Sequence, residues 1–98
     1  MSRTIVLSER DNVATALDEL ATGEAVVHAG HRVVALHSIP AGHKIALAPI
    51  GAGEAVIKYG EPIGRASRAI GAGEHVHVHN VQSERGRGDR RPSEDRAP

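Results

Sequence analysis

The sequence contains no cysteine, phenylalanine or tryptophan, and it has a single tyrosine, Tyr59. Without cysteine no disulfide framework can form, which is typical of a cytoplasmic protein. Without large aromatic side chains, the core has to be built from Val, Ile, Leu and Ala, which bury less apolar area per residue. At 98 residues we expect one small domain with a thin margin of stability, which a partner surface would improve.

The chain also lacks an excess of charge and any long apolar run. Its 12 basic and 12 acidic residues give a net charge of zero, which argues against nucleic acid or an anionic membrane as its main partner. No apolar run approaches the roughly 20 residues of a membrane span. The apolar run at residues 5–7 is too short for a secretory signal. We therefore expect a cytoplasmic protein.

The composition changes near the C-terminus. Residues 82–98 are rich in Arg, Asp and Glu and carry almost no apolar side chain. Such a segment cannot bury enough surface to offset the entropy of ordering it. The sequence therefore predicts a domain over residues 1–81 and a disordered charged tail over residues 82–98.

The domain is expected to be mainly β with one short helix near its start. The helix is predicted within 8–23, because Val13, Ala16, Leu17 and Leu20 have the spacing of one helical face. Asp11 or Asn12 would cap its start and Gly23 its end. Short strands are predicted over residues 24–28, 32–38, 44–48, 55–59 and 75–81, with glycine-rich turns between them.

Three segments share one pattern: an isoleucine, then Pro or Gly, then Ala-Gly, two variable residues and an aliphatic one. They begin at Ile39, Ile50 and Ile70. The pattern is that of a core anchor, a tight turn whose glycine adopts positive φ, and a strand leaving the turn. Three irregularly spaced copies are too few for a solenoid and favour long bent hairpins folded over themselves.

Three histidines alternate with valines in His75-Val76-His77-Val78-His79. In an extended strand, His75, His77 and His79 would share one face. Imidazoles placed in this way can bind a divalent metal, transfer a proton near neutral pH, or hold an anion when protonated. The alternative is that they are polar residues on an exposed face.

Two further segments are candidates for binding. His43 and Lys44 directly follow a turn, where a lysine can hold an anionic oxygen and a histidine can move a proton; an ordinary surface turn is the alternative. Tyr59 can donate through its hydroxyl or fill the core, and Lys58 would lie on the opposite face of a regular strand. The remaining histidines, His28, His31 and His37, are interpreted as structural or surface residues.

Four segments match one family in order and spacing. They are Asp11-Asn12-Val13-Ala14-Thr15-Ala16-Leu17, Ile39-Pro40-Ala41-Gly42-His43-Lys44-Ile45-Ala46-Leu47, Val56-Ile57-Lys58-Tyr59-Gly60-Glu61-Pro62-Ile63-Gly64-Arg65-Ala66 and His75-Val76-His77-Val78-His79-Asn80. Together they resemble the small SAF-type N-terminal domain of the altronate/galactarate dehydratase family, from about Asp11 to Val81, which is nearly the whole of the predicted domain. The resemblance implies a β-clip fold.

The resemblance also implies an activity. The family removes water, or in the related sulfolactate sulfo-lyases sulfite, from a 2-hydroxy acid, typically with a divalent metal such as iron or manganese. Some members are split, which implies a large catalytic subunit as the partner of this chain. We expect His75, His77 and His79 to be catalytic, with His77 and His79 on the metal. The residues expected to bind substrate are His43, Lys44, Tyr59 and Asn80.

Two other functions fit the same sequence. A stand-alone SAF-type module would bind a carbohydrate or a metal without catalysis, and the isolated domain would then bind its ligand. A plain oligomerisation unit would need neither ligand binding nor catalysis. A lyase subunit instead predicts a stable complex with a larger chain.

Overall fold

The computed structural model describes residues 3–6, 9–28 and 31–83. Within these ranges all regular structure is strand, so the prediction of a mainly β domain is confirmed. No helix in this part of the chain is long and apolar enough to cross a membrane. The strands are β1 (Thr4–Ile5), β2 (Val13–Ala16), β3 (Ala25–His28), β4 (His31–Val34), β5 (Lys44–Ala46), β6 (Ala55–Lys58), β7 (Glu61–Ala66), β8 (His75–Val76) and β9 (Val81–Gln82).

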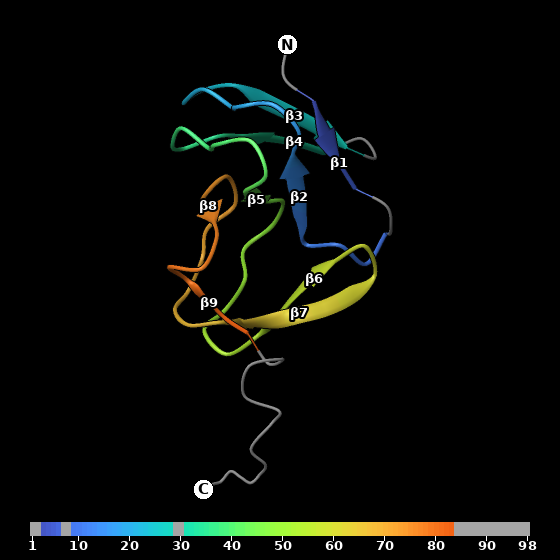
Figure 1. Ribbon diagram of the computed structural model, residues 1–98, viewed down its shortest axis with the longest axis vertical. Coiled ribbons are helices and arrows are strands. Elements are labelled where there is room, and N and C mark those ends of the chain that lie inside the picture. The colour runs from blue at the N-terminus through green and yellow to red at the C-terminus, as the bar shows by residue number, and fades with distance from the viewer. Residues whose placement is uncertain (1–2, 7–8, 29–30, 84–98) are drawn as a thin grey trace, which may run out of the picture.

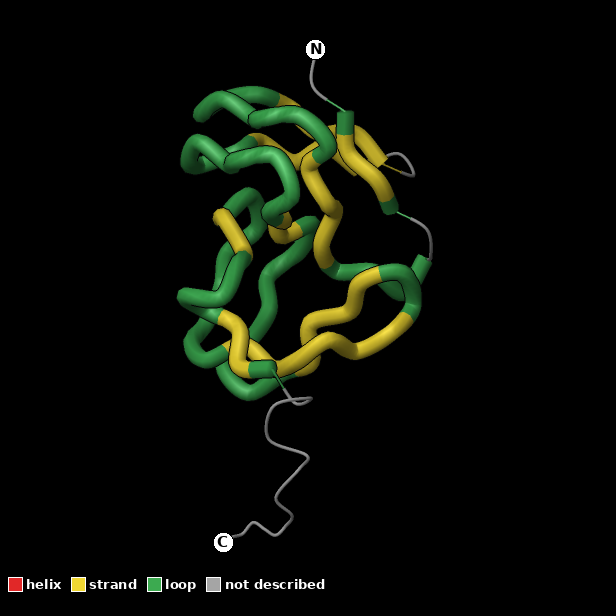
Figure 2. Tube along the Cα trace, in the orientation of Figure 1, coloured by secondary structure: helices red, strands yellow, loops and turns green. Residues whose placement is uncertain are grey.

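The strands form three small antiparallel sheets. The order is β1-β2-β5-β8 in the first, β3-β4 in the second and β6-β7-β9 in the third. The β3–β4 hairpin and β1 lie at one end of the molecule, β6, β7 and β9 lie at the other, and β2 and β5 connect the two ends (Figure 1). The strands are short and joined by long turns and loops (Figure 2), as expected for bent hairpins.

The core consists of two apolar clusters that meet at β2 and β5. On β2, Val13 belongs to one cluster and Ala14 to the other; on β5, Ala46 and Ile45 divide in the same way. Successive side chains of a strand point to opposite faces, so both faces of these two strands are covered. The central strands therefore carry apolar residues on both sides.

The predicted helix within 8–23 is wrong. Residues 13–16 form strand β2, which pairs with β1 and β5. Leu17, predicted on the buried helical face, is 40% exposed. A strand that is buried on both faces reads as a continuous apolar run, and over a short window its periodicity cannot be told from that of a helix.

The residues predicted to cap that helix have other partners. The side chain of Asn12 accepts from the N–H of Ile57 and donates to the carbonyl of Ala55, while Asp11 accepts from the N–H of Gly60. These bonds tie the start of β2 to the β6–β7 hairpin. At the other end of the domain, β9 includes Gln82, the first residue of the predicted tail, and residues 84–98 lie outside the described ranges.

Candidate functional site

Four turns of the same build organise the domain, one more than the sequence pattern predicted. Each begins with a buried aliphatic anchor and has a glycine of positive φ three residues later. The anchors pair by backbone bridges, Leu20 with Ile39 and Ile50 with Ile70. The additional turn starts at Leu20, and its pattern was hidden because it carries Leu and Thr where the other copies carry Ile and Ala.

In three of these turns a glutamate closes the turn. The carboxylates of Glu24, Glu54 and Glu74 accept hydrogen bonds from the backbone N–H groups of Ala21, Gly51 and Gly71, at 3.0, 2.7 and 2.8 Å.

The fourth turn carries His43 at the glutamate position. Its equivalent N–H donor would belong to Pro40, which has none. Because no N–H needs an acceptor here, the side chain of His43 does not have to close the turn, as the three glutamates do in theirs.

The side chain of His43 instead contacts two histidines, one in β8 and one just after it. Its Nδ1 atom lies 2.7 Å from Nε2 of His75. Its ring stacks on that of His77, with centroids 3.5 Å apart and planes 8° from parallel. One proton has to lie between the two nitrogens of the hydrogen bond, so the tautomers of His43 and His75 are linked.

The histidine segment is not one extended strand, and the prediction of a strand over residues 75–81 is wrong. β8 ends at Val76 and residues 77–80 form a turn. The reason is Asn80, whose buried side chain accepts from the N–H of His77 and donates to the carbonyl of His75. An asparagine that bonds to the backbone in this way favours a turn over a continuing ladder.

The turn still brings the predicted histidines together. The rings of His75 and His79 lie 4.8 Å apart between centroids, and those of His75 and His77 lie 6.1 Å apart. His43, His75 and His77 are partly buried, while His79 is exposed. We call these four side chains the imidazole cluster.

Two members of the cluster are held in the neutral form. Burial lowers the pKa of His75, and the neighbouring imidazoles, His79 first, add to this effect. Burial also lowers the pKa of His77, with further contributions from His43 and Lys44. The buried Nδ1 of His77 has no hydrogen-bond partner among the described residues. Neutral imidazoles can accept a proton at neutral pH.

Lys44 lies next to the cluster in sequence but projects from the other face of β5, since successive side chains of a strand alternate. Its ammonium is half-buried, and this burial lowers its pKa, as does the nearby charge of Lys58. In the register of β2 and β5 it stands opposite Thr15. The Thr15 hydroxyl accepts a hydrogen bond of 3.3 Å from the hydroxyl of Tyr59.

Tyr59 and Gly60 form the two-residue loop between β6 and β7, with φ values of 56° and 79°. Such a loop normally carries Asn, Asp or Gly at its first position, because other side chains are strained there. Lys58 lies with its ammonium 5.0 Å from the centre of the Tyr59 ring, not on the opposite side as a regular strand predicted. We call Thr15, Lys44, Lys58 and Tyr59 the lysine patch.

The imidazole cluster has the donor chemistry for a divalent metal but not the arrangement. Its rings are stacked, and Nδ1 of His43 and Nε2 of His75 are engaged with each other. Among the described residues, no group of three His, Asp or Glu side chains is placed to hold an ion. Iron or manganese at His77 and His79 therefore stays a prediction.

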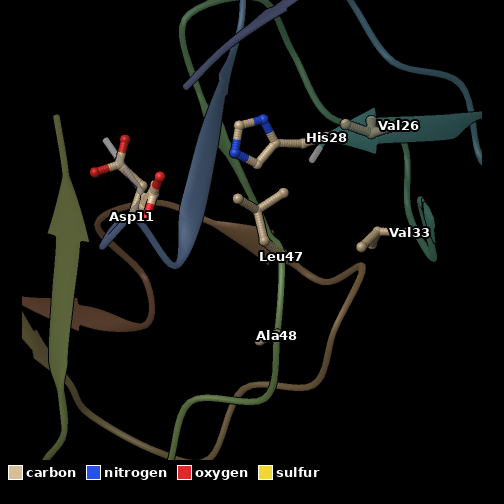
Figure 3. Close-up of a pocket in the computed structure, with 7 residues that line it drawn as sticks. Asp11, Val26, His28, Val33, Leu47 and Ala48 are labelled. Carbon is tan, nitrogen blue, oxygen red and sulfur yellow. The ribbon is translucent and has the colours of Figure 1, made fainter. Parts of the chain in front are cut away.

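A separate cavity of about 420 Å³ lies between the β3–β4 hairpin and the segments before β2 and after β5. Figure 3 shows its largely apolar wall, with the His28 ring above Leu47, the carboxylate of Asp11 to one side of Leu47, and Val26 and Val33 to the other. The residues lining it are Glu9, Asp11, Val26, His28, Val33, Leu47 and Ala48. None of them belongs to the imidazole cluster or the lysine patch.

The structure thus brings His43, His75, His77 and His79 together and places Lys44 and Tyr59 in a neighbouring patch. Asn80 shapes the turn through the backbone of His75 and His77. Sequence reasoning missed Thr15, which was assigned to a helix, and Lys58. The available signal was the pair Tyr59-Gly60 between two apolar runs, which has the length of a hairpin loop.

The pattern of the altronate/galactarate dehydratase SAF domain matches residues 2–84 of the chain. The chain is 41% identical over 83 residues to an altronate dehydratase of Bacillus subtilis, and these residues are 85% of this chain and 17% of that protein. It is 48% identical over 73 residues to an altronate dehydratase of Escherichia coli, covering 74% of this chain and 15% of that protein.

The chain is also similar to a shorter protein, the (2R)-sulfolactate sulfo-lyase subunit alpha of Chromohalobacter salexigens. The two are 52% identical over 48 residues, which are 49% of this chain and 51% of that subunit. The matched residues thus span about a sixth of the altronate dehydratases and about half of this subunit.

Proposed function

Because this chain belongs to the altronate/galactarate dehydratase family through its SAF domain, we propose that it is the small subunit of a lyase. The reaction is elimination of water or sulfite from a 2-hydroxy acid such as altronate, galactarate or sulfolactate. The catalytic remainder of the enzyme is proposed to lie on a larger partner subunit. The relative named subunit alpha supports this division.

One observation supports a catalytic role best: His43 occupies the position of a structural glutamate and contacts His75 and His77 instead. A histidine released from the turn and packed against two neutral imidazoles has no role in closing that turn. Closing the turn does not require a histidine at position 43, so a structural role does not account for the imidazole cluster.

The chemistry of elimination suits such a cluster. A base removes the proton from the carbon next to the carboxylate, and its electron pair forms a carbon–carbon double bond. The bond to the leaving group on the next carbon then breaks, and hydroxide leaves as water after receiving a proton, or sulfite leaves as the anion. Neutral His77 is the proposed base and takes the proton from carbon, while the hydrogen-bonded pair His43–His75 beside it is proposed to supply the proton that the leaving hydroxide takes.

Lys44 supplies the positive charge. As the half-buried cation whose field reaches His77, it is proposed to bind the substrate carboxylate and to stabilise the negative charge that develops when the proton leaves.

The test is purification of the tagged chain from its native cell extract, with mass spectrometry of what co-purifies and assays on altronate, galactarate and sulfolactate. A larger dehydratase-like chain and lyase activity are expected. His77→Ala should abolish the activity in the purified complex, while His28→Ala, a histidine outside the cluster, should leave it unchanged. Full activity of His77→Ala would overturn the role of the base.

The alternative function, a stand-alone SAF-type module, makes the opposite prediction. No partner would co-purify, and the isolated chain would bind a sugar acid or a divalent metal saturably without turning it over.

A further inference from the structure

The cavity between the β3–β4 hairpin and the segments before β2 and after β5 is separate from the imidazole cluster and from the lysine patch. Its volume of about 420 Å³ lies within the range of roughly 300–1,000 Å³ that is typical of small-molecule pockets. Val26 and Val33 are buried residues paired across the hairpin, and Leu47 and Ala48, which follow β5, continue the apolar wall. A ligand that fills this cavity therefore needs an apolar body.

Three polar side chains complete the wall of the cavity. His28 lies two residues after Val26 on β3, so both project from the same face of the strand, and the ring of His28 lies above Leu47 (Figure 3). The carboxylate of Asp11 lies to one side of Leu47 (Figure 3), and Glu9 also lines the cavity. Among the described residues no three His, Asp or Glu side chains are placed to hold an ion, so this geometry does not favour a metal.

The lysine-free and arginine-free wall of the cavity carries two carboxylates, those of Glu9 and Asp11. The carboxylate of Asp11 is held in place by the N–H of Gly60, which donates to it at 2.7 Å. The cations next to these residues in sequence or across the β6–β7 loop do not line the cavity; they are Arg10, Arg32 and Lys58. Two carboxylates repel an anion, such as the proposed hydroxy-acid substrate, and attract a cation.

We propose that this cavity is a second binding site, which takes a small organic cation: an ammonium group on an apolar body. The apolar body packs on Val26, Val33 and Leu47, and the ammonium group binds the carboxylates of Asp11 and Glu9. The site does not depend on the proposed lyase function, because none of its residues belongs to the imidazole cluster or to the lysine patch. Either proposal can therefore fail without the other.

The test is an NMR titration of the full chain at about pH 8, above the usual histidine pKa of about 6.5 and below the roughly 10.4 of a lysine ammonium. The probes are phenethylammonium, its uncharged isostere phenethyl alcohol and the anion phenylpropionate, all at one low ionic strength. Phenethylammonium should bind saturably and about three- to fivefold more tightly than the alcohol, as expected for an ion pair at a partly exposed site. Phenylpropionate should bind more weakly than both. The shifts should appear at the methyl groups of Val26, Val33 and Leu47.

Variants assign the binding to the cavity and the preference to its carboxylates. Ala48→Leu, a change at an exposed residue of the wall, should fill part of the cavity and abolish saturable binding in a chain whose spectrum is otherwise that of the folded parent.

Glu9→Gln combined with Asp11→Asn should remove the preference for the cation over the alcohol, and the Asn side chain can still accept from the N–H of Gly60. Glu19→Gln, the loss of an exposed carboxyl outside the cavity, is the matched control and should keep the preference. Three results would overturn the site: equal or no saturable binding of the cation and the alcohol by the parent, an unchanged preference in the double variant, or unchanged binding in Ala48→Leu.

Discussion

The Nδ1 atom of His43 and the Nε2 atom of His75 lie 2.7 Å apart, although 32 residues separate them in the chain. The contact exists because β5 and β8 are neighbours in one sheet, where Ile45 pairs with His75. It couples the protonation of the two rings, since a proton gained by one changes what the other can donate or accept.

His43→Glu should keep the fold and lose the reaction. Glutamate is the residue at this position in the other three turns, so the midpoint of urea unfolding should change little. The rate of elimination by the purified complex should fall about 100-fold or more. The reason is that the imidazole hydrogen-bonded to His75 and stacked on His77 is replaced by a carboxylate, which cannot stack on His77 in the same way. Glu54→Gln, a change in an equivalent turn outside the cluster, serves as control and should leave the rate unchanged. A variant that folds and retains full activity would show that His43 has no part in the chemistry.

Asn80→Ala should lower the free energy of unfolding by about 2 kcal/mol, because two backbone groups lose their partners at a fully buried position. Urea unfolding followed by circular dichroism measures this loss. Gln82→Ala removes an exposed amide nearby and should stay within about 0.5 kcal/mol of the parent. A loss for Asn80→Ala as small as that of the control would mean that the turn at residues 77–80 does not depend on this side chain.

The parts of the fold that the sequence predicted are those set by local chemistry. Isoleucine with a glycine three residues later marks the turns at Ile39, Ile50 and Ile70, because a tight turn needs a residue that is free to take positive φ. The turn at Leu20 was obscured by the helical spacing around β2. That spacing arose because β2 is covered on both faces, which a single sequence does not reveal.

In the candidate site too, local sequence identified individual residues, whereas the contacts between them depend on the whole fold. The alternation of histidine and valine identified His75, His77 and His79, but it did not indicate that His43 contacts them. The pairing with His43 depends on which strands are neighbours, a property of the whole sheet. Lys58 was predicted on the side opposite to Tyr59 because the strand was expected to continue to Tyr59, whereas β6 ends at Lys58 and Tyr59 has a positive φ in the hairpin loop.

Glu74 should make stability depend on pH in the acid range. The hydrogen bond from the N–H of Gly71 lowers the pKa of its carboxyl below the usual 4.5, and Arg68 adds to this effect. A carboxyl whose pKa is lower in the folded state stabilises the fold above its unfolded pKa, and that contribution is lost as the pH falls through the folded value. The free energy of unfolding of the parent minus that of Glu74→Gln should therefore be about 0.5 kcal/mol at pH 7 and shrink below about pH 4.5.

Urea unfolding of both proteins at several pH values between 3 and 7 (roughly the range in which carboxyl groups titrate) measures this difference. Glu61→Gln, which changes an exposed carboxyl, serves as the control and measures how much the loss of an ordinary carboxyl changes the pH dependence of stability. A difference that stayed constant across the range, or grew in acid, would contradict the assignment.

Gly73→Ala and Gly42→Ala form a matched pair that separates backbone strain from steric overlap. The two glycines occupy equivalent turn positions with φ of 88° and 89°. A Cβ atom at Gly42 would meet nothing within 4 Å, whereas at Gly73 it would overlap the carbonyl oxygen of Val34. Gly42→Ala should therefore cost about 1 kcal/mol, from strain alone. Gly73→Ala should cost about 3 kcal/mol or more, because Leu36 also bonds to Gly73 and the end of β4 would have to move.

Unfolding in urea, with the two variants side by side, measures both costs. Gly23→Ala, another open turn position, should behave like Gly42→Ala. Since Gly73 lies two residues before His75, a Gly73→Ala protein that still folds should also show shifted His75 resonances, while Gly23→Ala should not. Equal costs for the two members of the pair would mean that β4 does not approach this turn as closely as described.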